Sequence, residues 1–345
     1  MFKNKGFIIT VGVLFIALVA GFLTQGGDNE KATTPTSNTS SAEQAKHVYK
    51  VGLLQFVSHP ALDQITEGVK AGLKESGLTE GENLEIIFQN GQADQSKLTT
   101  MSQQLINEGS EILIGIATPA AQALANQTKD LPIILGAVTD PVGSGLISDM
   151  EKPGGNITGV SDKAPVLEQL KLAQTLMPDA KKMGILFSSS EDNSKYQVAE
   201  AVAVAKELGL TVEEFSVPST NEVSQVVQVM GKKVDFMYIP LDNTIANAMP
   251  AVVNEANKLR LPIITSADTM VAEGGLATIG INQFAIGLEA GKMAASVLKG
   301  ESETATTPVY TFTKGDLILN EKQAKFLNIE IPEKLKETAI MVGGE

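Results

Sequence analysis

The strongest constraint on the fold is a short pattern that occurs twice. The tetrad Leu-Pro-Ile-Ile stands at residues 131–134 and again at 261–264, and in both places it follows an apolar run and a stretch with helical spacing. Short apolar runs that alternate with helical patterns predict parallel strands covered by helices. Any two α/β stretches share these periods, but four elements in the same order predict two similar α/β lobes in tandem.

Each half is predicted to contribute four buried strands. They lie at residues 50–56, 84–88, 112–116 and 131–134 in the first half and at 182–187, 211–215, 234–239 and 261–264 in the second. Apolar residues recur at helical spacing between the first two strands of each half, at Leu62, Ile65, Val69 and Leu73 and at Val198, Val202, Ala205 and Leu208. Ligands of parallel sheets bind beyond the carboxyl ends of the strands. Two facing lobes therefore predict one cleft that closes over a small solute.

Composition and motifs exclude several classes of protein. The formal net charge of −13 over 345 residues, without clustered Lys and Arg, makes nucleic acid a poor partner. Cysteine is absent, which excludes disulfides, thiolate metal sites and cysteine nucleophiles. The chain has no G-x-S-x-G, no P-loop and no G-x-G-x-x-G that opens a helix. We therefore expect a binding protein with no catalytic residues, metal or cofactor, and not an enzyme.

The N-terminal residues predict a location outside the cytoplasm. Lys3 and Lys5 precede an uncharged run over residues 6–23 that is long enough to cross a bilayer. We interpret residues 1–23 as a transmembrane anchor, with a cleaved signal peptide as the alternative, although no A-x-A cleavage pattern lies near Ala20. The polar stretch over residues 24–46 is typical of a flexible linker.

The loops after the predicted strands carry the candidate ligand contacts. Ser58 or His59 is placed to cap a helix that begins at Pro60. His59 is one of two histidines, and no paired-His spacing indicates a metal site. Capping or ligand contact is therefore favoured over catalysis for His59.

Thr118 and Asp242 are predicted helix N-caps at equivalent places in the two halves. With Pro119 at the first helical position, the amides near Ala120 could hold a ligand carboxylate, unless Thr118 only caps its own helix. Asp242 begins a helix whose inner face carries Ile245, Met249, Val253 and Ala256. The Asp242 carboxylate could pair with an ammonium group. An amino acid would then meet an anion site on one lobe and a cation site on the other.

Further polar residues follow other strands. Asp140, after Thr139, and Asp268 lie at the lip of the predicted cleft, where each could fix a cationic group or only cap a turn. Ser190 and Asn193 add a hydroxyl and an amide at the start of a helix. The predicted ligand-binding residues are Gln55, Phe56, Ser58, His59, Thr118, Pro119, Ala120, Thr139, Asp140, Ser189, Ser190, Asn193, Asp242, Asn243, Thr244 and Asp268.

Three ordered motifs carry a resemblance to a known family. They are H-P-A-L-D at residues 59–63, D-P-V-G-S-G-L at 140–146 and P-G-G-N-I-T-G-V-S at 153–161. With these motifs the chain resembles the ABC transporter substrate-binding family, and most of all its tryptophan or tyrosine importer components from Gram-positive bacteria. The resemblance implies a periplasmic-binding-protein type I fold, in which two Rossmann-like lobes with parallel sheets are joined by a three-crossing hinge.

The implied lobes are discontinuous in sequence. The N-terminal lobe takes residues 47–160 plus about 282–306, and the C-terminal lobe takes 161–281 plus about 307–345. The chain lacks the lipobox cysteine of the commonest family pattern, which leaves the N-terminal segment as the anchor.

The resemblance also implies a function. A monomer anchored at the extracellular face of the cell membrane would capture tryptophan or tyrosine in the interlobe cleft and deliver it to an ABC permease and its ATPase. Phe56 and Pro119 are candidate walls of a flat apolar slot, although Phe56 could as easily belong to the core. The alternatives are a membrane-tethered ligand sensor and import of another small solute. A sugar-responsive repressor of this fold is not favoured, because an apolar span occupies the place of its DNA-binding helices.

Overall fold

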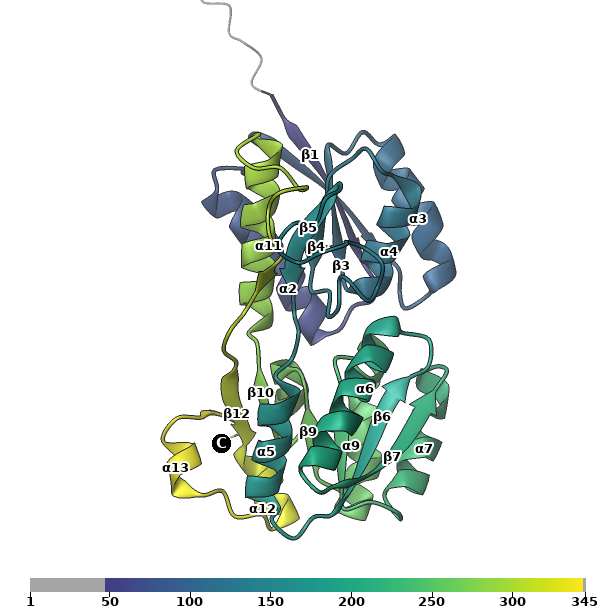
Figure 1. Cartoon of the computed structure of the whole chain (residues 1–345), viewed down its shortest axis with the longest axis vertical. Helices are drawn as coiled ribbons and strands as arrows, with labels where there is room; N and C mark the ends of the chain where they lie inside the picture. Colours follow the sequence, from purple (N-terminus) through teal and green to yellow (C-terminus); the bar gives the residue numbers. More distant parts are fainter. Residues whose placement is uncertain (1–46, 344–345) are drawn as a thin grey trace, which may run out of the picture. The chain divides into compact units, whose positions relative to one another are not determined.

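A computed structural model describes residues 47–343 as two α/β lobes, each built on one twisted sheet (Figure 1). The predicted anchor over 1–23 and linker over 24–46 lie outside the described residues. Among the helices at 47–343, none has the length and apolar character needed to cross a membrane.

The first lobe contains a six-stranded sheet in the order β11-β5-β4-β3-β1-β2, and every pairing in it is parallel. Its elements are β1 (Tyr49–Gln55), α2 (Pro60–Glu75), β2 (Leu84–Asn90), α3 (Gln95–Asn107), β3 (Ile112–Ile116), α4 (Thr118–Gln127), β4 (Ile133–Gly136), β5 (Ile157–Ser161), α11 (Gln283–Leu298) and β11 (Tyr310–Thr311). Helices α2 and α11 cover one face of the sheet, and α3 and α4 cover the other (Figure 1).

The second lobe contains a seven-stranded sheet in the order β13-β12-β10-β9-β8-β6-β7. Its elements are α5 (Val166–Leu176), β6 (Lys182–Ser188), α6 (Asp192–Glu207), β7 (Thr211–Val217), η1 (Thr220–Glu222), α7 (Val223–Met230), β8 (Phe236–Ile239), α8 (Asn243–Asn247), α9 (Met249–Leu259), β9 (Ile263–Thr265), α10 (Asp268–Ala272), β10 (Ala277–Gly280), β12 (Asp316–Asn320), α12 (Glu321–Leu327), α13 (Glu333–Lys336) and β13 (Ile340–Val342). The sheet is mostly parallel, as expected, and β12 runs antiparallel to its neighbour, β10.

Alternating side chains divide the second lobe into two cores, one on each face of its sheet. In β8, Phe236 and Tyr238 point into the core beneath α5 and α6, whereas Met237 and Ile239 point into the core beneath α7 and α9. A strand that is apolar on both faces is typical of a parallel sheet covered by helices on both sides. In the first lobe, Phe56 is 2% exposed and belongs to the hydrophobic core, which was the alternative to a role as a wall of the ligand slot.

The prediction of one helix from Asp242 to Ala256 is wrong, because the segment forms two helices. Helix α8 ends at Asn247 and α9 begins at Met249, with Ala248 between them. Pro250 has no backbone N–H to continue the hydrogen-bond ladder of α8, but it is well tolerated in the first turn of a new helix. Val253 is only partly buried on the resulting α9.

Three segments connect the lobes, which together with the two sheets confirms the periplasmic-binding-protein type I architecture. They join β5 to α5, β10 to α11, and β11 to β12 (Figure 1). The third crossing lies later than the expected boundary near residue 307, because Tyr310 and Thr311 pair with Val160 and Ser161 in the first sheet.

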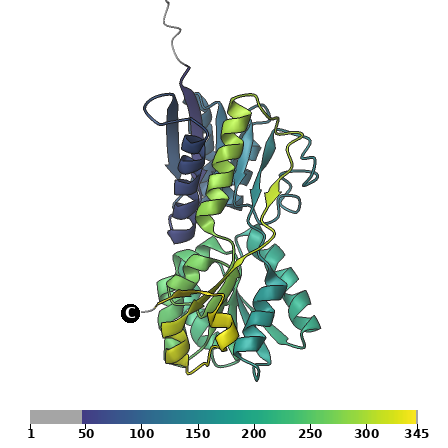
Figure 2. The same ribbon diagram turned by 90° about the vertical axis from the view of Figure 1, so that its left-hand side faces the viewer.

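Helices α2 and α11 lie side by side and parallel, in unusually close contact (Figure 2). Gly68 and Gly72 of α2 meet Gly287 and Gly291 of α11, and a Cβ atom at any of the four would collide with backbone of the other helix. At Gly287, for example, the added atom would meet the carbonyl oxygen of Ile65. The absent side chains let the two backbones touch.

Candidate functional site

A cavity lies where the carboxyl ends of strands from both sheets converge. Its lining residues follow β1, β3, β4, β5, β6, β8, β9 and β10, as the rule for parallel sheets predicts. They are His59, Ala61, Leu62, Ala117, Thr118, Ala137, Thr139, Asp162, Asn193, Leu241, Asp242, Asn243, Ala246, Ala267, Met270 and Gln283. Six of the predicted ligand-binding residues are among them: His59, Thr118, Thr139, Asn193, Asp242 and Asn243.

Four polar atoms at this cavity have no hydrogen-bond partner. Within residues 47–343, the buried side-chain atoms without a partner are Nδ1 of His59, Oγ1 of Thr118, Oδ1 of Asp162 and Oδ1 of Asn193. All four belong to residues that line the one cavity. Since a buried polar atom left unpaired is unfavourable by about 1–3 kcal/mol, their convergence makes this cavity the candidate ligand site.

Asp162 is the charged residue of the site that the sequence analysis missed. It follows β5 on the first crossing between the lobes and is 9% exposed. Burial raises the pKa of its carboxyl to about 6, and the Thr139 hydroxyl beside it offsets this only in part. The carboxylate is therefore charged at neutral pH and lacks a cationic partner. The only feature of the sequence that could have pointed to Asp162 is its position directly after the motif at residues 153–161.

His59 stands at the N-cap of α2 but makes no side-chain capping bond there. Its Nε2 atom lies 3.3 Å from Oδ1 of Asn243, so the ring links the two lobes. Burial lowers the pKa of His59 to about 4, which leaves the imidazole neutral at physiological pH. The structure thus favours a ligand or interlobe contact for His59 over helix capping.

Asp242 caps α8 as predicted, because its Oδ1 accepts a 2.8 Å hydrogen bond from the Ile245 amide. Its Oδ2 accepts from the Ser188 amide at 2.5 Å and from the Ser194 hydroxyl at 2.7 Å. Burial, and then the charge of nearby Glu191, raises the pKa of Asp242. Although Asp242 lines the cavity, both of its oxygens already hold protein donors.

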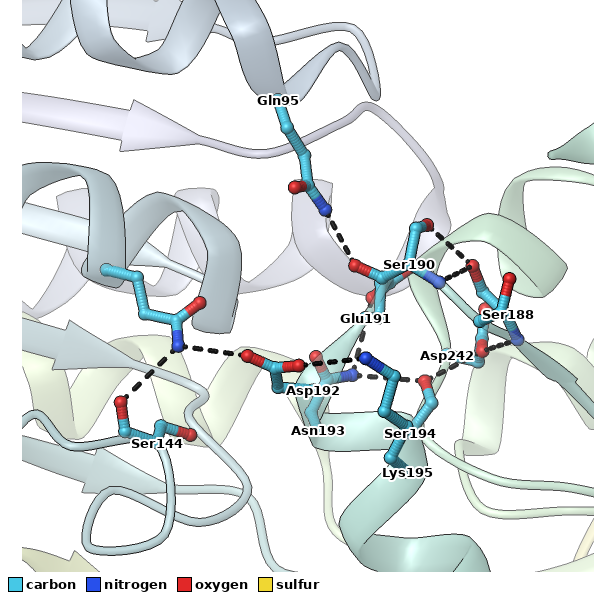
Figure 3. Close-up of polar contacts among 12 residues, drawn as sticks. Gln95, Ser144, Ser188, Ser190, Glu191, Asp192, Asn193, Ser194, Lys195 and Asp242 are labelled. Atoms are coloured by element: carbon cyan, nitrogen blue, oxygen red, sulfur yellow. Dashed lines mark hydrogen bonds and ion pairs between the residues drawn. The ribbon is translucent and has the colours of Figure 1, made fainter. Parts of the chain in front are cut away.

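Glu191, another residue missed from the sequence, organises the second-lobe side of the site (Figure 3). It is fully buried and accepts hydrogen bonds from the side chains of Asn193, Asn243 and Thr244. The hydroxyl of Thr244 donates to Glu191, and Thr244 is not among the lining residues.

Three helices of the first lobe begin at the cavity. Helix α4 starts at Thr118, not at Pro119, so the prediction of Thr118 as N-cap is wrong and Ala117 takes that place. Ala117 has φ 72° and ψ 155°, a region that only glycine adopts readily, and no local sequence signal predicts it. Helices α2 and α11 begin nearby, at Pro60 and Gln283. The first-turn amides of such helices have no partner within the helix and carry partial positive charge.

Several predicted residues lie away from the cavity. Gln55 is buried within the first lobe, where it donates to Val57 O and Asp63 Oδ1, and the Ser58 hydroxyl also donates to Asp63. Pro119 and Ala120 are buried in the first turn of α4 but are not lining residues. Phe56 is core and not a wall.

The remaining predicted residues serve local structure. Asp140 caps its own turn through the Gly143 amide, 2.9 Å away. Asp268 holds the Thr269 amide and lines a separate groove. The hydroxyl of Ser189 donates to Val217 O, and that of Ser190 pairs with Ser188.

Two glutamines of the first lobe contact the second lobe beside the cavity. Gln95 Nε2 donates to the backbone carbonyl of Ser190 at 2.9 Å, and Gln122 Nε2 donates to Asp192 Oδ2 at 3.4 Å (Figure 3). Asp192 is also held by Lys195 at 3.1 Å. The two lobes therefore touch at the rim of the cavity.

Known proteins are similar to this chain in sequence and in architecture. A relative from Clostridioides difficile (strain R20291), the "Tyrosine-binding protein", is 37% identical over 332 residues, which is 96% of this chain and 94% of the relative. The solved structure of the ABC domain in complex with L-Trp from Streptococcus pneumonia is 50% identical, with a TM-score of 0.83 over 86% of this chain and 99% of that one.

A second solved structure shows a different state of a related protein. The ligand-free, open structure of a substrate binding protein with adhesive properties from Clostridium difficile is 38% identical, with a TM-score of 0.67 over 86% of this chain and 100% of that one. Residues 50–342 match the family described as ABC transporter substrate binding protein. On this match, and on these relatives, the chain belongs to the ABC transporter substrate binding protein family.

Proposed function

We propose that the protein captures a zwitterionic aromatic amino acid, tryptophan or tyrosine, in the cavity between its lobes and delivers it to an ABC permease. The observation that carries the proposal is the convergence of four unpartnered buried polar atoms on one cavity. A ligand with one anionic and one cationic end, held close together, supplies partners of both kinds.

The ligand carboxylate binds at the helix starts of the first lobe. The amides in the first turns of α2 and α4 and the free hydroxyl of Thr118 offer donors, and the helix dipoles favour negative charge there. No Lys or Arg is among the lining residues, so these groups carry the anion recognition.

The ligand ammonium binds to Asp162. Its carboxylate is buried and ionised at neutral pH, and its Oδ1 lacks a partner. Asp242, which the sequence analysis favoured for this role, already accepts three hydrogen bonds. The cation site therefore lies on the first crossing of the hinge, and an ammonium there relieves an unfavourable buried charge.

The aromatic ring occupies the apolar part of the cavity. The nonpolar lining side chains are Ala61, Leu62, Ala117, Ala137, Leu241, Ala246, Ala267 and Met270. The alanines add little bulk to this lining, and the methionine sulfur favours an aromatic neighbour. The higher TM-score against the L-Trp complex than against the open structure fits a closed arrangement of the lobes.

Substrate-binding components of ABC importers work outside the cytoplasmic membrane. In this proposal the chain acts there as a monomer, held by residues 1–23, and has no catalytic role. Its partners are the permease and its ATPase, which import the captured solute.

Calorimetry with matched ligands tests the proposal. We expect binding of L-Trp and L-Tyr, and binding weaker by about tenfold or more for tryptamine and indole-3-propionate, which lack the carboxylate and the ammonium respectively. Because the chain contains no Trp, indole fluorescence reports only the ligand. Equal affinity for all four compounds would contradict zwitterion recognition. Loss of labelled tryptophan uptake in a deletion strain, restored by the wild-type gene, tests the transport role.

A further inference from the structure

Glu191 is not a lining residue of the cavity, but it holds two residues that are, Asn193 and Asn243. Its Oε1 accepts from the amide and hydroxyl of Thr244 at 2.8 and 2.7 Å. Its Oε2 accepts from the side-chain amides of Asn243 at 2.5 Å and Asn193 at 3.3 Å, and from the Asn243 backbone amide at 3.3 Å. A carboxylate offers acceptors only, so every group that faces it must be a donor.

This requirement fixes which way the two asparagine amides point. The NH2 group of Asn243 must face Glu191, so its carbonyl oxygen faces the other way, toward His59. Asn193 is oriented in the same sense, since its NH2 group donates both to Glu191 and to the carbonyl of Leu241 at 2.8 Å. The carbonyl oxygen of Asn193 is then one of the unpartnered atoms at the cavity.

The orientation of Asn243 in turn fixes the proton on His59. Because Oδ1 of Asn243 can only accept, the Nε2 atom of the neutral ring must carry the hydrogen. The other nitrogen, Nδ1, is then a bare acceptor, and it too is unpartnered and buried at the cavity. A carboxylate in the second lobe thereby determines the tautomer of a histidine in the first.

We propose that Glu191 is a positioning residue that keeps His59 Nδ1 unprotonated and holds the carbonyl oxygen of Asn193 at the cavity, so that with Asp162 the site presents three acceptors to a primary ammonium group. This proposal rests on the function proposed above and names what selects the amino group. A primary ammonium has three N–H donors, whereas a ligand without one leaves all three acceptors unpaired.

The test is Glu191→Gln, which keeps the volume but replaces one acceptor by an NH2 group. One side of the glutamine must then face a donor, so Asn243 loses its fixed orientation and His59 its fixed tautomer. We expect L-Trp affinity to fall about tenfold or more while indole-3-propionate affinity changes less than about twofold. The matched control is Thr244→Val, which removes another hydrogen bond to the same carboxylate but leaves both amides in place. Thr244→Val should preserve the ratio of the affinities for L-Trp and indole-3-propionate.

Nitrogen-15 NMR of the histidine rings provides a direct readout. The chain has two histidines, His47 and His59, so assignment is simple. In the wild-type L-Trp complex we expect His59 to be protonated at Nε2, and in the Glu191→Gln complex to be a mixture of tautomers. A wild-type complex protonated at Nδ1 would overturn the inference without any variant, even if Glu191→Gln did not fold. The inference would also be overturned if folded Glu191→Gln kept the wild-type ratio of L-Trp affinity to indole-3-propionate affinity.

The two proposals fail in different ways. If wild-type protein binds L-Trp and indole-3-propionate equally, the ammonium site itself is wrong, and the function proposed above fails with it. If the wild type discriminates and Glu191→Gln discriminates equally well, only the role of Glu191 is wrong.

Discussion

His59, at the start of α2, and Asn243, at the start of α8, are 184 positions apart in sequence, yet His59 Nε2 lies 3.3 Å from Asn243 Oδ1. The pair joins the lobes at the cavity, and separating the lobes would break it. Contacts that exist only when the lobes meet contribute to ligand affinity, because they favour the closed state that holds the ligand.

Removing both rim glutamines should weaken this closed state. In Gln95→Ala/Gln122→Ala, two hydrogen bonds to the second lobe are lost while the cavity lining is unchanged. Each is worth about 0.5–1.5 kcal/mol, less where exposed, so we expect affinity about 2- to 10-fold weaker and faster dissociation by stopped-flow fluorescence. Gln103→Ala, which removes a contact to Gln127 within the first lobe, is the control. Identical dissociation rates in both variants would show that the rim contacts contribute nothing.

Asp162→Asn should remove the charge that holds the ligand ammonium. A hydrogen bond between charged partners is worth about 1.5–3 kcal/mol, so L-Trp affinity is expected to fall about 10-fold or more by calorimetry. Asp140→Asn retains an oxygen for the turn it caps outside the cavity and should bind as the wild type does. Equal effects of the two substitutions would remove Asp162 from the ammonium site.

Affinity should depend on pH through Asp162. Its pKa of about 6 in the free protein is raised by burial, and a bound ammonium lowers it, so binding releases a proton below pH 6. L-Trp affinity should therefore be constant above about pH 7 and fall, by up to tenfold per pH unit, as the pH decreases below 6. Calorimetry between about pH 5 and about pH 8 measures this dependence, which should be absent in Asp162→Asn.

The same carboxyl has the opposite effect on the stability of the ligand-free protein. Because its folded-state pKa lies above the unfolded value, the folded state gains stability from protonation of Asp162 and loses it as the pH rises through about 6. Asp162→Asn should consequently raise the melting temperature relative to the wild type above pH 6 more than near pH 4, in thermal scans without ligand. A difference that is the same at both pH values would argue against a raised pKa.

Gly287→Ala should destabilise the first lobe. The new methyl group would overlap the Ile65 carbonyl in α2, and overpacking of this kind costs about 1–3 kcal/mol or more. We expect a lower urea midpoint by circular dichroism. Gly155→Ala adds the same methyl group where no atom lies within 4 Å and should leave the midpoint almost unchanged. A normal midpoint for Gly287→Ala would mean that the helices can separate freely.

The repeated pattern predicted much of the fold, because strand and helix periods are local properties of the chain. The strand at 112–116 agrees with β3 residue for residue, and Asp242 caps its helix as the sequence indicates. The antiparallel β12 and the late third crossing escaped prediction, since pairing partners far apart in sequence decide them.

The site was harder to predict than the fold. Thr139 and Asn193 were found because polar residues after parallel strands gather at one edge. Asp162 was missed because it lies on a crossing between the lobes and not on a loop within one lobe, and Glu191 because a buried carboxylate looks like a solvated one in sequence. The left-handed backbone of Ala117 had no glycine to indicate it.

The glycine contacts fasten α11, which follows the second crossing between the lobes, to α2, which begins beside the cavity. Both helices point the same way, so their amino ends, at Pro60 and Gln283, lie together near the cavity. The second crossing enters α11 directly, through Ile281 and Asn282. In the proposed complex, the α2 amides that receive the carboxylate are thus held in place before the solute arrives, and the entropy of ordering them is lost during folding and not during capture.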